Sequence, residues 1–431
     1  MLPSEHSPLL NGNPRRPHSV YSKILVLLKA DGEPSWQDSY RQFIFGSWTN
    51  LLLLLVPVAA AAHYLTWDAP LRFGLSFVAI IPLAKLLGDA TEQMSLSLGQ
   101  TLAGLLNATF GNAVEIIVGL VALLKGEVRI VQTSMLGSIL SNILLVLGSS
   151  FLAGGLYKHE STFRVTAAQT SVSPSSALMT LACITLVIPA AYHAAKHVAP
   201  VKGGLASLSD QSISDLDEKS RKGLLIISRG TAVLLLGVYI AYLFFQLKTH
   251  AALFVPRRKP TVPNEPVPEV EQEEEVETPK MSVASAGLGL LIVTVVTSFV
   301  ADFLVASIEE TANRFGISKA FIGLILLPIV ANAAEHVTSV WMAMKDKMEL
   351  TIGICVGSSI QIATFVVPLL VVIGWFSGHE LTLFFDDFET VSLFVSVLLV
   401  NILLQDGKSN YMEGLMLITL YLVIALAFWV A

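Results

Sequence analysis

Residues 112–115 read Asn112-Ala113-Val114-Glu115, and residues 332–335 read Asn332-Ala333-Ala334-Glu335. Each tetrapeptide lies within a long apolar stretch, and the two are offset by 220 residues. The same offset, carried without gaps, aligns further pairs: Asp89 with Glu309, Thr91 with Thr311, Lys125 with Lys345, Gly137 with Gly357, and Ser138 with Ser358. Several matches at one offset indicate that the chain contains a duplicated unit.

The composition around this repeat is that of an integral membrane protein. Of the 431 residues, 53% are hydrophobic and 14% are charged, whereas soluble domains have about 25% charged residues. The net charge of −6 gives no support for nucleic-acid binding. A helix needs about 20 apolar residues to cross a bilayer. Eleven runs meet this test: 47–66, 71–97, 101–125, 129–155, 175–194, 225–247, 283–311, 319–345, 350–376, 388–405 and 411–431.

The predicted fold class is an all-α polytopic membrane protein with about 11 transmembrane helices. One extra N-terminal span precedes two five-helix repeats, and because five is odd, the second repeat enters the membrane in the opposite sense. The predicted domains are a cytosolic tail with a surface helix (1–45), a first span (46–70), two repeats (71–249 and 283–431) and an acidic, proline-rich linker (250–282). Ion sites of inverted-repeat transporters lie near the midplane, where the repeats meet.

The N-terminal tail carries an acidic dileucine pattern, Glu5 with Leu9 and Leu10. Sorting adaptor proteins bind such patterns, and the alternative is a plain disordered tail. The basic residues of the tail favour a cytosolic N-terminus, because cytoplasmic segments carry an excess of Lys and Arg. An odd number of spans then places the C-terminus in the lumen.

Glu115 and Glu335 are the candidate ion-exchanging and metal-ligating residues. An ionised side chain at the bilayer centre costs roughly 2.5–3.5 kcal/mol on insertion scales. A structural hydrogen bond is the simpler explanation for one such carboxylate, but two at equivalent positions indicate a function. Asn112 and Asn332 stand three residues earlier, on the same helix face as their glutamates.

Carboxylate and amide oxygens are hard ligands that suit calcium, and two glutamates balance its two charges. Without the cation, two carboxylates that face each other in a low dielectric cannot both stay ionised, so protons bind instead. One site that holds either calcium or protons is the physical basis of antiport. No other cofactor is expected.

Small and polar residues flank this pair. Gly111 permits close helix approach or exposes a backbone carbonyl. Ser138, Ser358 and Gln361 place polar groups on the next helix of each repeat, where interhelical hydrogen bonding is the alternative role. His336 adjoins Glu335 and either tunes its proton affinity or simply packs.

A second tier of acidic residues lies toward the ends of the spans at 71–97 and 283–311: Asp89, Glu92, Asp302 and Glu309. These are candidate passageway or proton-relay groups. Lys85, in the first of these spans, is an expected partner for one of the carboxylates.

The motifs resemble those of a known family. Gly111 to Glu115 and Asn332 to His336 resemble the two signature repeats of the calcium/proton exchangers, within the calcium/cation antiporter superfamily. The segments Met135–Asn142 and Val356–Gln361 are similar to the paired motifs downstream. The resemblance covers nearly everything from about residue 70 onward except the linker, and fungal vacuolar members are the most similar.

The resemblance implies calcium uptake into the vacuole, driven by protons leaving it. It assigns cation binding to Glu115 and Glu335, with help from Asn112 and Asn332. The chain departs from the family pattern at Ala331, where the second motif usually has glycine, so the added methyl group is expected to narrow access to that half of the site.

Three alternatives stay open. Manganese/proton or sodium/calcium exchange is the first, because hard oxygen ligands serve several cations. A membrane-embedded enzyme is the second, although the chain has no His-Glu-x-x-His motif. A passive channel is the third. A homo-oligomer is neither required nor excluded by the sequence.

Overall fold

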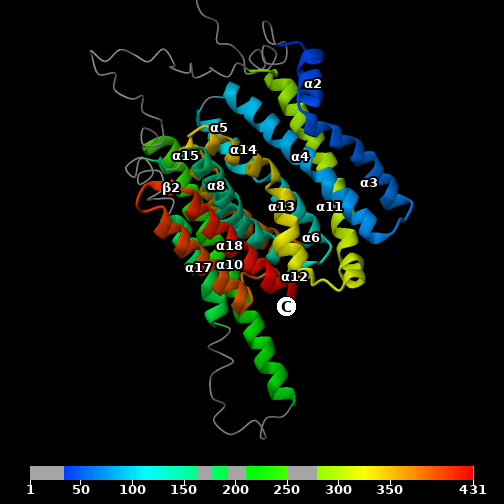
Figure 1. Ribbon diagram of the computed structural model, residues 1–431. Helices are drawn as coiled ribbons and strands as arrows, with labels where there is room; N and C mark the ends of the chain where they lie inside the picture. Colours follow the sequence, from blue (N-terminus) through cyan, green and yellow to red (C-terminus); the bar gives the residue numbers. More distant parts are fainter. Residues whose placement is uncertain are drawn as a thin grey trace, which may run out of the picture.

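The computed structural model describes residues 34–98, 100–158, 160–163, 177–192, 210–250 and 279–430, and these form a helical bundle (Figure 1). The dileucine pattern and most of the acidic linker lie outside the described residues. Six described helices are long and apolar enough to cross a membrane, or up to eight if each of two bent pairs is one span. The all-α membrane fold is therefore confirmed, while the count of eleven spans stays a prediction.

The first part of the described chain is a bent pair. Helix α2 (Trp36–Phe45) meets η1 (Trp48–Leu54) and α3 (Leu55–Tyr64) at an angle of 88°. Asn50 stabilises this corner because its side-chain amide donates to the Phe43 and Ile44 carbonyls. Tyr40 ties α2 to the second half of the chain through the Ser285 carbonyl.

The described part of the first repeat contains six labelled α-helices, two π-helical segments and one further apolar helix. In order they are α4 (Ala69–Leu98), α5 (Gln100–Phe110), α6 (Ala113–Leu124), α7 (Val128–Leu140), η2 (Ser141–Val146), α8 (Leu147–Lys158), the helix Ala177–Tyr192, and α10 (Asp210–Phe244) with η4 (Phe245–Thr249). Strand β1 (Glu160–Thr162) follows α8.

The second repeat follows the same plan. Its elements are α11 (Val283–Phe315), α12 (Lys319–Phe321), η6 (Ile322–Leu326), α13 (Leu327–Ala331), α14 (Ala333–Met344), α15 (Met348–Gln361), η7 (Ile362–Val366), α16 (Val367–Ser377), α17 (Asp387–Leu403), β2 (Lys408–Asn410) and α18 (Tyr411–Val430). Strand β2 pairs antiparallel with β1, which joins the two repeats.

The most buried spans are the repeat-equivalent pair Val128–Lys158 and Met348–Ser377. In their most apolar windows 72% and 67% of residues are buried, against 33% in α18. Each contains one π-helical turn, η2 or η7, directly after its Gly-Ser motif. Such turns are rare and occur often at functional sites, so their matching positions point to the centre of the bundle.

Helices α4 and α11 pack along each other on one side of these central spans (Figure 1). Arg72 near the start of α4 pairs with Glu310 near the end of α11 at 2.8 Å, so the two helices run antiparallel. Helix α2 lies at the upper end of the bundle in Figure 1 and the C-terminus at the lower end. Helix α2 and the end of α18 therefore lie at opposite ends of the bundle.

Candidate cation-binding site

Two of the predicted spans, 101–125 and 319–345, each contain a break between two helices. In the first repeat α5 ends at Phe110 and α6 begins at Ala113. In the second, α13 ends at Ala331 and α14 begins at Ala333, with a bend of 57°. An asparagine occupies each break, and each candidate glutamate lies in the first turn of the following helix. Broken helices free backbone carbonyls at membrane depth, where transporters use them to hold cations.

The two breaks face each other across the centre of the bundle. Glu115 is 3% exposed and lines a cavity together with Ser138 and Ala331, the last residue of α13. Glu335 itself is only half-buried. The two candidate glutamates thus lie in different environments, and their role as a pair stays a prediction.

Each asparagine contacts the Gly-Ser helix of the opposite repeat. The Ser358 hydroxyl donates to Asn112 Oδ1 at 2.9 Å, and Asn112 Nδ2 donates to Gln361 Oε1 at 2.6 Å. In the equivalent place, Asn332 Nδ2 donates to the Ser138 carbonyl at 3.3 Å. The supporting residues named from the sequence thus gather at the site, but through contacts that cross between the repeats.

Asn142 completes this network. Its amide donates to Ser358 Oγ at 3.1 Å, and Asn142 and Ser358 both face the Glu335 carboxylate. Asn142 ends the motif Met135–Asn142 that the sequence analysis singled out, although its repeat-equivalent is Ile362 and the offset itself gives no signal there. Cys355 and Ser339, 3.6 Å apart beside the site, were also missed.

Several oxygens of this cluster are buried without a hydrogen-bond donor. Among the described residues they are Asn142 Oδ1, Asn332 Oδ1 and Glu335 Oε2. A buried acceptor left unpaired costs about 1–3 kcal/mol, so three together require an explanation. Carboxylate and amide oxygens of this kind are among the ligands that Ca²⁺ takes in proteins.

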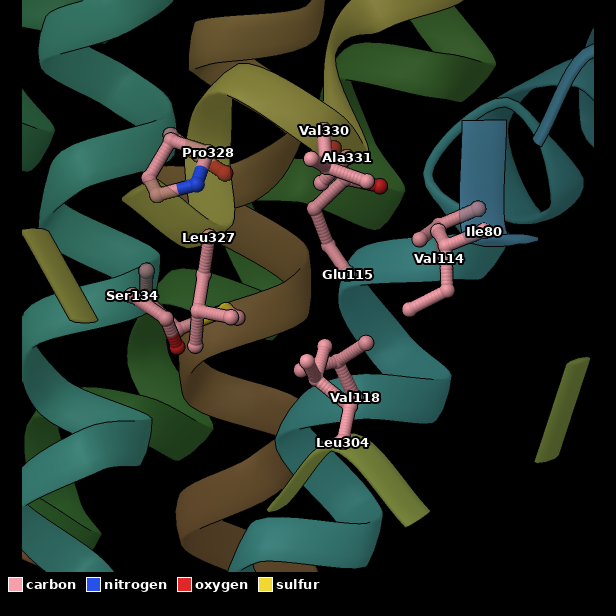
Figure 2. A pocket seen from close by; sticks show the side chains of 12 residues that line it. Ile80, Val114, Glu115, Val118, Ser134, Leu304, Leu327, Pro328, Val330 and Ala331 are labelled. Carbon is pink, nitrogen blue, oxygen red and sulfur yellow. The ribbon is translucent and has the colours of Figure 1, made fainter. Parts of the chain in front are cut away.

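A small cavity adjoins Glu115 (Figure 2). Its volume is about 10 Å³, roughly the space that one water molecule needs. Apart from Glu115, Ser134 and Ser138, its walls are apolar: Ile80, Val114, Val118, Met135, Leu304, Leu327, Pro328, Val330 and Ala331. Ala331 lies directly on this wall, so the methyl group that departs from the family pattern faces the first glutamate's cavity.

The two breaks differ because Gly111 and Ala331 differ. A Cβ atom at Gly111 would lie 2.5 Å from the Asn107 carbonyl oxygen, closer than side chains approach backbone. Ala331 instead continues the helix α13, and the chain turns only at Asn332. The first break therefore requires glycine, whereas the second tolerates a side chain.

The second-tier carboxylates lie in ion pairs away from the central cluster. Asp89 pairs with Lys85, the partner expected from the sequence. Asp302 pairs with Lys125 at 2.8 Å, and Glu309 pairs with Lys319 at 3.2 Å. Glu92 is exposed near the end of α4, and His336 is half-buried beside Glu335. Passageway and tuning roles for these residues stay predictions.

No group of three or more His, Cys, Asp or Glu side chains gathers as a metal centre in the part of the chain that the structure describes. The central site instead combines two carboxylates with amide, hydroxyl and backbone oxygens. Such a mixed oxygen set is weaker than a dedicated metal cage, which suits an ion that must be released.

Comparison with known proteins places the chain among ion exchangers. The family described as sodium/calcium exchanger protein matches residues 69–248 and 285–430, which include both breaks. The chain belongs to this family. It is therefore a transporter and not an enzyme, and the membrane-embedded enzyme is set aside.

Individual relatives support this assignment. The chain is 45% identical over 389 residues to a vacuolar calcium ion transporter of Schizosaccharomyces pombe, with 90% of this chain and 86% of the relative covered. It is 42% identical over 392 residues to vacuolar cation/proton exchanger 3 of Oryza sativa subsp. japonica, covering 91% and 88%. The solved structure of native YfkE, a Ca²⁺/H⁺ antiporter, superimposes with a TM-score of 0.68 at 32% identity and covers 89% of this chain and 100% of YfkE.

Proposed function

We propose that this exchanger is a calcium/proton antiporter of the vacuolar membrane, which exchanges cytosolic calcium for vacuolar protons by alternating access. One observation carries the proposal: Glu115 and Glu335 approach each other from the breaks of two inverted helices, among buried oxygens that lack donors. Both Asn112 and Asn332 belong to the same site.

Charge balance explains how this site would exchange two kinds of ion. Two carboxylates offset the two charges of calcium, and the unpaired amide and carboxylate oxygens complete its coordination. When calcium leaves, two carboxylates in a largely apolar surround repel each other and take up protons. Calcium and protons therefore compete for the same oxygens, so only one kind of ion is carried in each direction.

The relatives support the choice of ions and membrane. The fungal relative is named for vacuolar calcium transport, and the rice relative for vacuolar cation/proton exchange. For the orientation we propose a cytosolic N-terminus and a luminal C-terminus. Helix α2 and the end of α18 lie at opposite ends of the bundle, which is consistent with this arrangement (Figure 1).

The test is calcium uptake into sealed vesicles that contain the purified protein, with and without an imposed proton gradient. We expect uptake only with an acidic interior. Glu115→Gln and Glu335→Gln should each abolish it, because one remaining charge cannot balance calcium. Glu380→Gln, which alters an exposed ion pair with Arg221, is the matched control and should transport normally. Near-normal uptake by both site variants would refute the assignment.

The same vesicles separate the remaining alternatives. The family also contains sodium/calcium exchangers by name, so an imposed sodium gradient is the first comparison. Uptake driven by sodium and not by protons would replace the proposed counter-ion. Manganese uptake that exceeds calcium uptake under the same proton gradient would instead replace the proposed substrate.

A further inference from the structure

Two glycines, Gly137 and Gly323, allow helix α7 and the π-helical segment η6 to pack closely against each other. Helix α7 lies against η6 so closely that a Cβ atom at Gly137 would overlap the Leu324 backbone. A Cβ atom at Gly323 would likewise overlap the Thr133 side chain. Both Thr133 and Gly137 are buried. The contact involves the same stretch of α7 as Ser134 and Ser138, which line the cavity beside Glu115.

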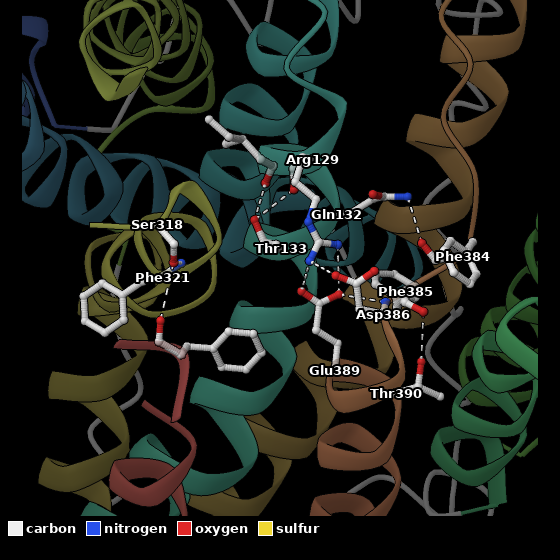
Figure 3. Close-up of polar contacts among 12 residues, drawn as sticks. Arg129, Gln132, Thr133, Ser318, Phe321, Phe384, Phe385, Asp386, Glu389 and Thr390 are labelled. Carbon is white, nitrogen blue, oxygen red and sulfur yellow. Dashed lines mark hydrogen bonds and ion pairs between the residues drawn. The ribbon is translucent and has the colours of Figure 1, made fainter. Parts of the chain in front are cut away.

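Polar and aromatic contacts also hold the short helix α12, which precedes η6. Lys319, at the start of α12, lies 3.4 Å from Glu127 before α7 and 3.2 Å from Glu309 on α11. Ser318 donates to the Phe428 carbonyl at 3.4 Å (Figure 3). The Phe321 ring packs edge-on against Trp429. The short helix α12 is therefore fastened to α7, α11 and α18.

The repeat-equivalent face of α15 has no such cover. The 220-residue offset pairs Thr133 with Gly353 and Gly137 with Gly357. Gly353 is exposed and Gly357 half-buried, and among the described residues nothing approaches within 4 Å of a Cβ atom at either position. These two glycines form a Gly-x-x-x-Gly spacing, which lets two helices approach closely in membranes.

The segment that the symmetry assigns to this face lies elsewhere. The same offset pairs Leu324 with Gly104 of α5, so α5 is the counterpart of the α12–η6 segment. Helix α5 packs instead against α4 and η4, where Leu247 occupies the space beside Gly104. The contact between η6 and α7 predicts an equivalent contact between α5 and α15. Helix α5 instead packs against α4 and η4.

The helix that carries Glu335 is uncovered on the same side. Val337 is 72% exposed, whereas its repeat-equivalent, Ile117, is 9% exposed. Thr338 is also exposed, and its equivalent Val118 is buried. The asymmetry between the two halves thus extends from the empty glycine face to the immediate neighbourhood of the second glutamate.

We infer that the face formed by Gly353 and Gly357 on α15 is the docking site for α5, and that α5 closes onto it when the transporter changes state. Gly104 then contacts Gly357 as Leu324 now contacts Gly137. The proposed closure covers the exposed face at Gly353 and approaches the exposed side of α14 next to Glu335. This inference rests on the proposed function and adds the contact that closes the site.

Gly357→Val tests the contact without disturbing the present packing, because open space surrounds Gly357. We expect an unchanged melting temperature and unchanged calcium binding to the purified protein. Proton-driven uptake should fall about ten-fold or more, since a β-branched side chain prevents a contact that only glycine permits. Gly237→Val, also in open space but on α10, is the matched control and should transport normally.

A cross-link provides the second arm. In a background with Cys183 and Cys355 changed to alanine, Gly104→Cys and Gly357→Cys form a disulfide only if their Cα atoms come within about 7 Å. We expect oxidation to link them during transport, to stop uptake, and to be reversed by reductant. Normal uptake by Gly357→Val, or the absence of any cross-link in an active double-cysteine protein, would overturn the inference. If Glu115→Gln blocks uptake while Gly357→Val does not, the antiport proposal is retained and only the proposed contact between α5 and α15 is rejected.

Discussion

The buried ion pair between α7 and α17 allows a stability prediction with a worked magnitude. Arg129 Nη1 and Nη2 bind Glu389 Oε2 and Oε1 at 3.0 and 2.6 Å, and Nη2 also binds Asp386 at 2.6 Å (Figure 3). The Glu389 side chain is fully buried, whereas that of Arg129 is 35% exposed. Glu389 also closes a capping box at the start of α17.

Arg129→Met removes the cation and leaves the Glu389 carboxylate buried without a counter-charge. Breaking a buried pair in this way costs roughly 3–5 kcal/mol. Water reaches the place of the Arg129 head group, and the Asp386 backbone N–H still donates to Glu389 at 3.2 Å. We therefore expect a loss at the lower limit, about 3 kcal/mol.

Thermal unfolding of the detergent-solubilised protein is the assay. The expected loss lowers the melting temperature by several degrees. Adding Glu389→Gln to Arg129→Met should recover much of it, since glutamine keeps the capping geometry without the buried charge. Arg221→Met, which breaks an exposed pair, is the control and should cost no more than about 1 kcal/mol. The reasoning about the buried charge is wrong if Arg129→Met has the same melting temperature as the wild-type protein. It is also wrong if the double variant has a lower melting temperature than Arg129→Met.

Substitutions at three further positions test the geometry of the breaks. Gly111→Ala should destabilise the protein by about 1–3 kcal/mol, measured by thermal unfolding, because its Cβ atom would meet the Asn107 carbonyl. Ala331→Val should lower calcium uptake several-fold, because two added methyl groups exceed a cavity of about 10 Å³, while Ala331→Gly should preserve it in the same vesicle assay. Gln361→Leu should weaken calcium binding about ten-fold, measured by titration calorimetry. The substitution removes the Gln361 Oε1 acceptor of the 2.6 Å hydrogen bond and leaves the Asn112 amide without a partner, at a cost of about 1–3 kcal/mol.

Much of this molecule could be predicted from its sequence. The offset that pairs Glu115 with Glu335 is a property of the chain alone, and so is the cost of a carboxylate in an apolar run. Together they predicted a membrane transporter with two repeats and a paired carboxylate site. The family match confirms the class, and in the structure the asparagine of each break bonds to the Gly-Ser helix of the opposite repeat.

Only the tertiary structure decided how the repeats engage. Hydropathy averages over a whole turn or more, so it cannot locate a break at a single asparagine, and 101–125 appeared continuous. An offset shows which residues are equivalent, but not that Asn112 contacts Ser358 of the opposite repeat, because such contacts depend on how two helices cross. Equivalence also predicts symmetry, whereas a packed bundle holds one conformation at a time: Gly137 is covered and Gly357 is not. The sequence by itself thus determined the two equivalent carboxylates. Packing determined that the Gly-Ser helix of the first repeat is covered at Gly137, whereas that of the second repeat is open at Gly357.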